Sequence, residues 1–552
     1  MKLNKKLFVI LVLIFLGLTI RIFGISDLPL YGDELTLVYD TFSVLKTGQD
    51  QTGKFFPVTF PMGAGRPGGY IYFSIPFVAM FGPNALGVRA LSLLSGIGII
   101  LLVYLLTKKL INAKVAQIAA VLIAISPWSI NLSRGGYESH FALFLSLLGL
   151  YSYLLAKQKP LMLILSAFFF GFAIHTYPTF KMTLPILVPL FILLVGDAKN
   201  TFFKRKLYSL AAASILIFFS LLSLMQTLNF GSETRFQQIN IFTSPEFVQK
   251  VTERVNKERE FSTARNFIKP FISNKVVEYS FYLIENYTKN LSPEFLFLRG
   301  DRNPRHNMSL MGGLYLAELL TVILGSVFLL SKKTNISLVS TSKLLVLLIS
   351  WILITPLPTS LLPETHFLRN SLMLIPLNIL SALGIYSLVS LEKNRVKTFS
   401  LFVLFAAVSI QLLFLVYRIF FVSPNEFSRF WSYGAKHASM MVAENIHKFD
   451  YFILSDKVDN LEYAYPVYSK ISPREVIEQN SQKTKLNGYE FKKFDKVYIG
   501  SIPSSKVKVF LENLNGSYFY IGPVEDGWEL EPFETINNKD NLPAFIVAKK
   551  IK

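Results

Sequence analysis

The chain has 552 residues, of which 52% are hydrophobic and only 17% are charged, and its mean hydropathy is +0.43. Soluble proteins carry about 25% charged residues, so the composition excludes an ordinary soluble protein and predicts a multi-pass membrane protein. The net charge of +20 does not indicate nucleic acid, because no recognition module is visible and much of the lysine and arginine lies between apolar runs. Cysteine is absent, which excludes disulfides, thiolate metal sites and cysteine nucleophiles.

The first apolar run, residues 7–26, follows a basic N-terminal stretch, and no small-residue cleavage site comes after it. We therefore interpret it as a retained membrane anchor rather than a signal peptide. Further runs long enough to span a bilayer bring the prediction to about eleven transmembrane helices. They are residues 85–107, 115–131, 139–156, 160–176, 182–196, 207–228, 309–331, 342–362, 367–390 and 398–423.

Basic clusters between these runs predict the orientation of the chain. The positive-inside rule places the N-terminus and every cluster in the cytoplasm, and an odd number of helices then places the C-terminal segment outside. The clusters are Lys108, Lys109 and Lys114; Lys157 and Lys159; Lys199, Lys204, Arg205 and Lys206; Lys332 and Lys333; and residues 392–397.

This orientation predicts a transmembrane domain over residues 1–423, with large outside loops at 27–84 and 229–308. Helix-like stretches lie near 245–260 and 264–287 in the second loop. The apolar piece at 70–81 in the first loop is too short to span and contains a proline, which predicts an interfacial or re-entrant segment.

The tail from 424 to 552 has short β-like and helical stretches in place of long apolar runs. Short β-like runs lie at 451–455, 496–500 and 544–548, and a helical stretch at about 430–448 precedes them. The tail is therefore predicted to be a small extracytoplasmic α/β domain, near the usual size of a domain.

An acidic pair, Asp33 and Glu34, follows the first apolar run on the predicted outer side. A carboxylate beside a sugar acceptor can act as a general base that removes a hydroxyl or amine proton. Carboxylates at the edge of a membrane are functional candidates by default. The alternative is helix capping, because acidic residues favour the first turn of the helix that residues 35–45 would form.

A short outside turn at residues 133–140 holds a cation, a carboxylate and an imidazole. The fork of the Arg134 guanidinium matches phosphate oxygens, and Glu138 could orient Arg134 or hold a cation. The alternative is a solvated turn in which Glu138 begins the next helix.

Two further outside segments carry basic residues. Arg66 lies in the glycine-rich stretch 63–70, which lets the backbone approach a ligand closely but is also typical of a simple turn. Lys181 follows Tyr177 in the turn 175–181, where it either contacts phosphate or snorkels from a helix end.

The last cluster, residues 363–370, contains His366 and Arg369. Arg369 falls slightly inside an apolar stretch, where an unpaired charge costs about 2.5–3.5 kcal/mol. We favour a lipid-linked phosphate as its partner, against an internal pair with Glu364 or a head-group contact.

Metal and nucleotide motifs are not visible. The six histidines are scattered without a His-x-x-x-His spacing, so the sequence assigns no metal ligand and no cofactor, although it leaves a divalent metal ion open. No Walker loop is present, which argues against ATP-driven transport.

The chain resembles the GT-C fold membrane glycosyltransferases, specifically glycosyltransferase family 39, which includes protein O-mannosyltransferases and the lipid A aminoarabinose transferase. The resemblance rests on the order and placement of several short motifs. These are residues 28–34 (LPLYGDE), 81–90 (FGPNALGVRA), 124–128 (AISPW) running into Ser133 and Arg134, and 366–369 (HFLR).

The resemblance implies a polyprenyl-phosphate sugar donor, transfer on the outer face of the cell membrane to a lipid, glycan or protein acceptor, and inversion at the anomeric carbon. It implies that Asp33, which matches the aspartate in the family's first loop, acts as base or activates the acceptor. We prefer Asp33 as the base, with Glu34 as its helper or as a helix cap. Relatives of the aminoarabinose-transferase type carry Glu-Lys-Pro-Pro where this chain has residues 65–68 (GRPG), so the basic residue survives and its acidic neighbour does not. The predicted phosphate ligands are Arg66, Arg134, Arg369 and Lys181, with Glu138, His366 and Tyr177 in support.

A transporter or flippase of lipid-linked sugars is the alternative function. Transporters concentrate charge near the bilayer midplane, often in repeated halves. Here the charge lies at the predicted outer boundary and no matching halves are visible, which favours the enzyme.

Overall fold

The computed structural model describes residues 5–62, 65–196, 202, 205–229, 240–331, 340–392, 394–530 and 533–551. The predicted cytoplasmic lysines Lys199, Lys204, Lys332, Lys333 and Lys393 lie outside these residues. The chain forms two compact units, and it passes between them several times. The first unit is Met1–Ile22, Gly63–Gly69 and Ser92–Val416; the second is Phe23–Met62, Tyr70–Leu91 and Tyr417–Lys552.

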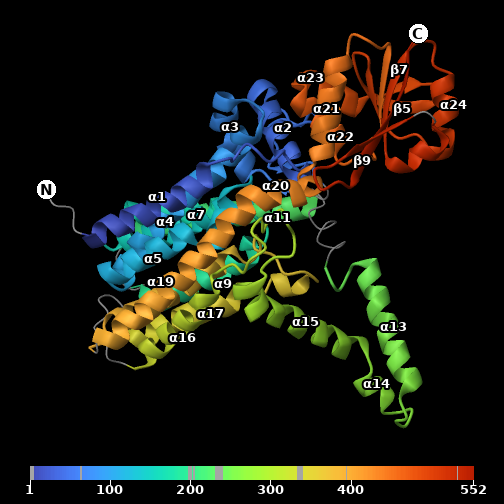
Figure 1. The fold of residues 1–552 in the computed structure, drawn as a ribbon. Helices are drawn as coiled ribbons and strands as arrows, with labels where there is room; N and C mark the ends of the chain where they lie inside the picture. Colours follow the sequence, from blue (N-terminus) through green and yellow to red (C-terminus); the bar gives the residue numbers. More distant parts are fainter. Residues whose placement is uncertain are drawn as a thin grey trace. The chain divides into compact units, whose positions relative to one another are not determined.

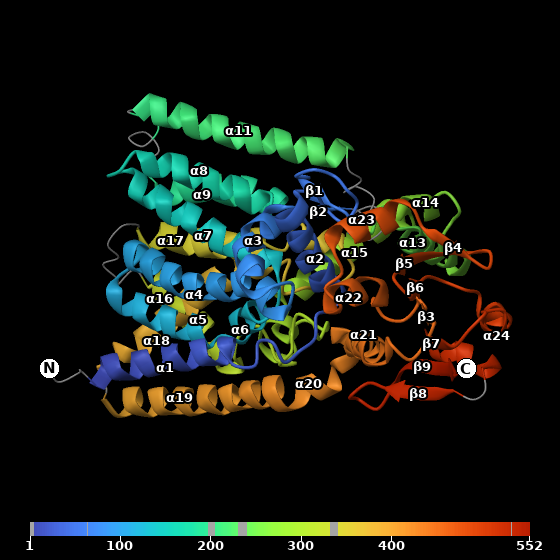
Figure 2. The ribbon, with the colours of Figure 1, turned by 90° about the horizontal axis from the view of Figure 1, so that it is seen from above.

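The first unit is a bundle of apolar helices in which α1, α4, α5 and α7 run side by side (Figure 1). Figure 2 shows α8 between α9 and α11. The bundle helices are α1 (Lys5–Ile22), α4 (Ala85–Leu110), α5 (Ala113–Ile125), α6 (Pro127–Ser133), α7 (Glu138–Ala156), α8 (Leu161–Ile174), α9 (Phe180–Val195), α11 (Lys206–Asn229), α16 (Leu316–Leu330), α17 (Thr341–Ile354), α18 (Leu374–Val389) and α19 (Asn394–Tyr417).

Two glycines let α16 and α18 approach closely. A Cβ on Gly325 would stand 1.9 Å from the Leu380 carbonyl oxygen, and a Cβ on Gly384 would stand 1.9 Å from that of Thr321. Small residues at such crossings are how membrane helices gain packing contacts, because lipid supplies no hydrophobic driving force between helices.

Each predicted apolar run contains a helix, but their lengths differ. Among the described residues, six helical segments are long and apolar enough to cross a membrane, and α5 with α6 forms a further pair bent by 55°. The count of eleven stays a prediction, because α8, α9 and α16 are shorter than the spanning criterion. The six segments are Ala85–Leu110, Glu138–Ala156, Lys206–Met225, Thr341–Leu361, Ser371–Val389 and Asn394–Glu426.

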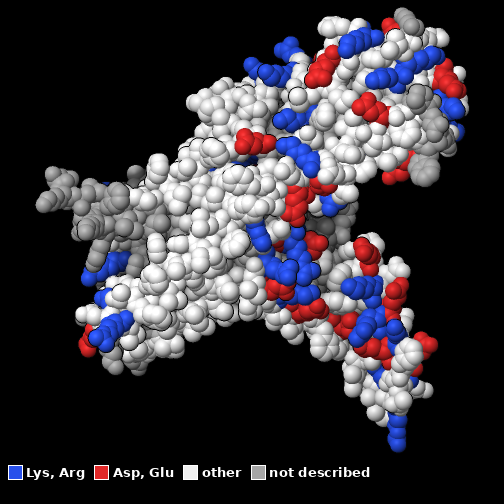
Figure 3. All heavy atoms as spheres, in the orientation of Figure 1, with Lys and Arg blue, Asp and Glu red and all other residues white. Residues whose placement is uncertain are grey.

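Two of these segments face outward with apolar side chains. Only 11% of the apolar window is buried in Lys206–Met225 and in Asn394–Glu426, and large residues such as Leu207 and Phe399 are exposed. Figure 3 shows few charged residues over the length of the bundle, whereas Lys, Arg, Asp and Glu gather over α13 to α15. An apolar surface of this extent requires lipid, so the chain is a membrane protein.

The second predicted loop contains the helices expected there. These are α13 (Pro245–Phe261), α14 (Lys269–Ile272) and α15 (Lys275–Leu291). Short helical turns join the longer elements of the chain: η2 (Glu294–Leu298), η3 (Thr359–Leu361), η4 (Ser371–Met373), η5 (Arg418–Val422), α20 (Ser423–Glu426), η6 (Ser428–Trp431), η7 (Ser504–Lys506) and η8 (Val524–Glu529).

The second unit contains a seven-stranded sheet in the order β4-β5-β6-β3-β7-β9-β8. The central strand β3 pairs in parallel with β6 and β7, so Phe452 lies opposite Val497 and Phe519, and the outer pairs are antiparallel. The strands are β3 (Tyr451–Leu454), β4 (Thr484–Leu486), β5 (Tyr489–Phe494), β6 (Val497–Ile499), β7 (Tyr518–Gly522), β8 (Glu534–Asn537) and β9 (Pro543–Lys550).

Helices accompany this sheet: α21 (Tyr433–Asn445), α22 (Leu461–Tyr468), α23 (Pro473–Ser481) and α24 (Val507–Glu512). The predicted strands at 451–455, 496–500 and 544–548 and the predicted helix at 430–448 are confirmed by β3, β6, β9 and α21. The tail therefore has the α/β character that its sequence predicts. Two short strands lie elsewhere in the chain, β1 (Thr59–Phe60) and β2 (Arg66–Pro67).

Residues from the first predicted loop belong to the same compact unit as the tail. They form α2 (Gly32–Thr47) and most of α3 (Gly69–Phe81). The Tyr468 hydroxyl accepts from the Leu30 amide at 3.1 Å, and the Tyr39 hydroxyl donates to the Ile471 carbonyl at 2.9 Å. The predicted division at 424 stays a prediction, and these contacts show that the tail packs against residues 23–62.

Candidate functional site

The acidic pair begins α2, and its second member is fully buried. Glu34 accepts two hydrogen bonds from Arg89, from Nε at 2.8 Å and from Nη2 at 2.6 Å, and neither side chain is exposed. The same guanidinium donates to the carbonyls of Ile25, Leu28 and Pro29 at 2.6–2.9 Å. Arg89 thereby fixes the backbone between the first helix and α2.

Asp33 lies beside this pair and is half-buried. The N-cap of α2 is Tyr31, which makes no side-chain capping bond, so both carboxylates lie in the first turn near the positive end of the helix. A Cβ on Gly32 would stand 2.6 Å from the side-chain oxygen of Asn460, so a larger residue here would displace that side chain. The geometry separates the roles of the two acids: Glu34 holds Arg89, while Asp33 is the more accessible carboxylate.

Arg66 and Glu138 form an ion pair in the first unit. Nε of Arg66 lies 2.9 Å from the Glu138 carboxylate, and the side chains are 6% and 16% exposed. The sequence indicates no acidic neighbour for Arg66 within the first loop, and the structure supplies one from the first residue of α7. Glu138 thus pairs with Arg66, whereas the sequence considered it as a partner of Arg134.

Arg134 caps α6 and is almost completely buried. Its Nη1 donates to the Ile20 carbonyl at 2.6 Å and lies 3.5 Å from that of Arg21. Arg21 is itself fully buried and donates to the Ile123 carbonyl and the Ser129 hydroxyl, both at 2.9 Å. Arg21 thus satisfies carbonyls at the end of α5, where α5 breaks into α6, and Arg134 satisfies carbonyls at the end of α1. The sequence analysis missed Arg21, although an arginine inside an apolar run is the signal that would have found it.

The remaining basic candidates lie in turns at helix ends and are half-buried. Lys181 is the second residue of α9, and the Tyr177 ring just before it meets Phe180 edge to face at 6.1 Å. Arg369 lies in a turn just before η4, at the start of the apolar run 367–390. The helical part of this run begins only after that turn, at η4 and α18.

His366 belongs to a buried cluster that the sequence analysis did not find. Its Nδ1 lies 3.1 Å from Nδ1 of His306 and 3.6 Å from Oδ2 of Asp301, and His306 Nδ1 lies 3.0 Å from the same oxygen. All three residues are buried. The two histidines are sixty positions apart, so no short motif contains both of them. The local sequence shows only that Asp301 and His306 lie five residues apart in a stretch with glycine and asparagine.

The cluster alters the pKa of its members. Burial alone would raise the pKa of Asp301, but the charge and hydrogen bond of His306 and the bond from His366 hold it well below its usual range. Burial would lower the pKa of His366, yet the hydrogen bonds to Asp301 and Glu364 raise it overall. The hydrogen bond from His366 in turn lowers the pKa of Glu364.

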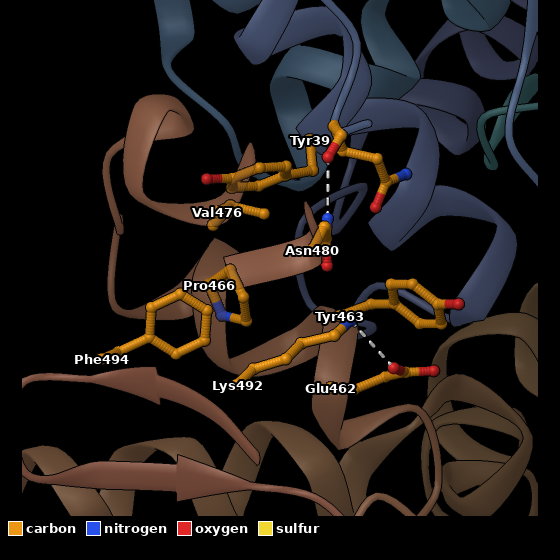
Figure 4. A pocket seen from close by; sticks show the side chains of 9 residues that line it. Tyr39, Glu462, Tyr463, Pro466, Val476, Asn480, Lys492 and Phe494 are labelled. Carbon is orange, nitrogen blue, oxygen red and sulfur yellow. Dashed lines mark hydrogen bonds and ion pairs between the residues drawn. The ribbon is translucent and has the colours of Figure 1, made fainter. Parts of the chain in front are cut away.

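The second unit contains a small polar and aromatic pocket (Figure 4). Asn480 donates to the Gln51 carbonyl at 2.8 Å, and Lys492 pairs with Glu462 at 3.2 Å on the opposite wall. Burial raises the pKa of the Tyr463 phenol to about 12. The pocket is lined by Tyr39, Gln51, Glu462, Tyr463, Pro466, Val476, Asn480, Lys492 and Phe494, none of which the sequence analysis predicted as a site residue.

The predicted site residues are divided between the two units. Asp33 and Glu34 belong to the second unit, and the predicted phosphate ligands and supporting residues belong to the first. Within the first unit, the ion pair of Arg66 and Glu138 joins two of the predicted residues directly.

Comparisons with known proteins agree with the membrane fold. Residues 66–223 match the family model described as dolichyl-phosphate-mannose-protein mannosyltransferase. No curated protein sequence matches the chain.

Solved structures are similar over nearly the whole chain. ArnT from Cupriavidus metallidurans in the apo state has a TM-score of 0.55 at 10% identity, over 99% of this chain and 98% of that one. The same protein bound to undecaprenyl phosphate has a TM-score of 0.51 at 10% identity, over 98% and 97%.

The Archaeoglobus fulgidus oligosaccharyltransferase tethered to an acceptor peptide has a TM-score of 0.52 at 14% identity, over 95% of this chain and 70% of that one. The fold of the chain is therefore shared with ArnT and with this oligosaccharyltransferase. The chain has the GT-C fold, and its residues 66–223 are similar to the dolichyl-phosphate-mannose-protein mannosyltransferase family model.

Proposed function

We propose that the chain transfers a sugar from a polyprenyl-phosphate donor to an acceptor on the outer face of the cell membrane. The observation that carries the proposal is the GT-C fold over 99% of the chain, together with the mannosyltransferase-model match over residues 66–223. The ArnT structure bound to undecaprenyl phosphate supports a polyprenyl-phosphate donor for this chain too.

The proposed topology is the one that the sequence predicts. The chain crosses the membrane about eleven times, with the N-terminus in the cytoplasm and the loops 27–84 and 229–308 and the tail outside. The six segments of spanning length and the further, shorter apolar helices support this arrangement.

The proposed reaction is a direct displacement with inversion. An acceptor oxygen or nitrogen attacks the anomeric carbon, the bond from that carbon to the phosphate oxygen breaks, and the lipid phosphate leaves with the bonding electrons. Asp33 receives the acceptor proton as general base. Glu34 acts through Arg89, which holds the backbone that presents Asp33.

Cationic side chains stabilise the negative charge of the departing phosphate, which is often the largest catalytic contribution. Arg66 is the first candidate, because Glu138 holds its guanidinium in one orientation and a pre-oriented cation needs no rearrangement during the reaction. Arg369 and Lys181 are further candidates in turns, and Arg134 contributes while it caps backbone carbonyls. His366 and Tyr177 support these turns.

The test uses membranes containing the full chain and a panel of radiolabelled polyprenyl-phosphate sugars. We expect wild type to move label from one of these lipids to an acceptor and Asp33→Asn to lose that transfer. Asp456→Asn is a matched control, because Asp456 is an exposed aspartate that accepts a hydrogen bond from Ser501.

Two results would refute the proposal. Transfer by Asp33→Asn at the wild-type rate would remove Asp33 from the mechanism. Label that crosses the bilayer while still attached to its lipid would identify a flippase instead of a transferase.

A further inference from the structure

Three potential metal ligands converge in the cluster of Asp301, His306 and His366. The three facing atoms are Oδ2 of Asp301 and Nδ1 of each histidine, and they form a triangle with sides of 3.0, 3.1 and 3.6 Å. The side chains are 1%, 9% and 10% exposed in that order. Two loop segments contribute them, residues 299–308 and 363–370.

Hydrogen bonds from the histidines or a bound cation can hold these three atoms together, and the cation leaves fewer unfavourable contacts. If both Nδ1 atoms carry a hydrogen, two N–H groups face each other across 3.1 Å. If either Nδ1 lacks a hydrogen, its lone pair has the Asp301 carboxylate close by, at 3.0 or 3.6 Å. A cation among the three atoms removes both conflicts, because each atom then presents a lone pair to the same positive charge.

The dimensions of the triangle suit zinc. Zinc binds histidine nitrogen at about 2.0–2.1 Å and carboxylate oxygen at about 2.0–2.2 Å, so neighbouring ligand atoms in a tetrahedral site are about 3.3 Å apart. For a triangle with the observed sides, a point about 2.0–2.1 Å from all three atoms exists just outside its plane. The atoms therefore need little movement to hold the ion.

The surroundings of the cluster also fit a metal site. Metal-binding histidines commonly donate their second ring nitrogen to a carboxylate, which fixes the ring orientation. Nε2 of His366 lies 3.4 Å from the Glu364 carboxylate. Asp301 is oriented by the Asn303 amide, which donates to Oδ1 at 2.8 Å, and by the Phe367 amide, which donates to Oδ2 at 2.8 Å.

We propose that Asp301, His306 and His366 bind a divalent transition-metal ion, zinc by preference, with a fourth position open to water or to an anionic ligand. The ion ties residues 299–308 to residues 363–370. The sequence analysis assigned no metal ligand, and this proposal names three. It does not depend on the proposed transferase activity.

The ion also positions neighbouring groups in the same unit. Phe367 stacks on Trp128 with ring centroids 4.7 Å apart, and Trp128 Nε1 donates to the Phe367 carbonyl at 3.1 Å. Arg369 follows two residues later. A metal on His366 therefore fixes the turn that carries Arg369 against the broken helix α6.

The test measures bound metal in the full chain purified in detergent. After incubation with zinc and removal of free metal by gel filtration, elemental analysis should find about one zinc per wild-type chain. His306→Gln should retain at least tenfold less zinc, and Glu364→Gln should bind zinc about 10–100-fold more weakly. His447→Gln is the matched control, because His447 is an exposed histidine in the tail.

Cobalt substitution gives a second readout that needs no variant. Cobalt(II) in a four-coordinate nitrogen and oxygen site absorbs visible light, and zinc should displace it with loss of the absorption. The temperature of thermal unfolding should rise when zinc binds and should return to its original value after a chelator removes the zinc.

The proposal is overturned if wild type retains no zinc and shows no cobalt absorption. Equal zinc in folded His306→Gln and in His447→Gln also overturns it and leaves a hydrogen-bonded cluster without metal. If His306→Gln does not elute as a folded species, the wild-type zinc content and cobalt spectrum decide.

Discussion

The chain contains two arginine–glutamate pairs that differ in how completely they are buried. Arg89 and Glu34 in the second unit are both 0% exposed, and that guanidinium donates to the Glu34 carboxylate and to three backbone carbonyls of the same unit. Arg66 and Glu138 in the first unit are 6% and 16% exposed, and Nε of Arg66 lies 2.9 Å from the Glu138 carboxylate. The first pair fixes the backbone before α2, whereas the second holds the Arg66 guanidinium in one orientation and is slightly less buried.

The largest expected effect separates Asp33 from its neighbour Glu34. Asp33→Asn should lower sugar transfer about 10²–10⁴-fold, the usual contribution of a general base, while thermal unfolding stays near wild type. Glu34→Gln should lower the unfolding temperature and retain transfer per folded molecule. Transfer assays and thermal unfolding in detergent check both, and the opposite pattern would make Glu34 the reactive acid.

The buried pair should be critical for stability. Arg89→Met leaves Glu34 charged and unpaired, which typically costs about 3–5 kcal/mol of unfolding free energy. The carbonyls of Ile25, Leu28 and Pro29 also lose their donor. Denaturation in mixed micelles measures the loss. A cost below about 1 kcal/mol would show that the pair is not the anchor described above.

The partly exposed pair should affect substrate more than stability. Arg66→Gln should raise the donor KM about tenfold, in keeping with loss of a charge-assisted hydrogen bond, and should lower unfolding free energy by only about 1 kcal/mol. Glu138→Gln should show a smaller change of the same kind, because Arg66 remains but is less well oriented. An unchanged donor KM in both variants would remove Arg66 from the donor site.

The smallest effect is expected at the pair of Lys492 and Glu462, which are 18% and 30% exposed. Lys492→Met should change unfolding free energy by about 0–1 kcal/mol. The loss of unfolding free energy in Lys492→Met is the reference with which the loss in Arg89→Met is compared. A loss as large as that of Arg89→Met would mean that burial does not distinguish the pairs.

The sequence predicts the elements that have a strong local pattern. Apolar runs locate the membrane helices, and the short β-like runs at β3, β6 and β9 locate three strands. The strands β4 and β8 escape prediction, because their short polar sequences TKL and ETIN pair at one side only, at the edges of the sheet. Their structure depends on neighbours that are distant in sequence.

The candidate site also contains residues that the sequence predicts and partners that it does not predict. Asp33 and Glu138 are recognisable as charges at helix starts and Arg66 as a cation in a glycine-rich stretch, but the ion-pair partners are not recognisable. Glu34 takes its arginine from 55 residues away, and His366 meets His306 across 60 residues. Such pairings are set by helix packing and loop closure, which no local spacing encodes.

The contacts of the Asp33 segment also set an order of events during synthesis. Leu30 bonds to Tyr468 and Tyr39 to Ile471, partners separated by 438 and 432 residues. Translation at about 5–20 residues per second delays the second partner by about 20–90 s. Throughout that interval the segment carrying Asp33 is already synthesised but lacks its contacts with Tyr468 and Ile471. Arg89, by contrast, follows Glu34 by only 55 residues, so the buried ion pair can form long before the contacts with the tail.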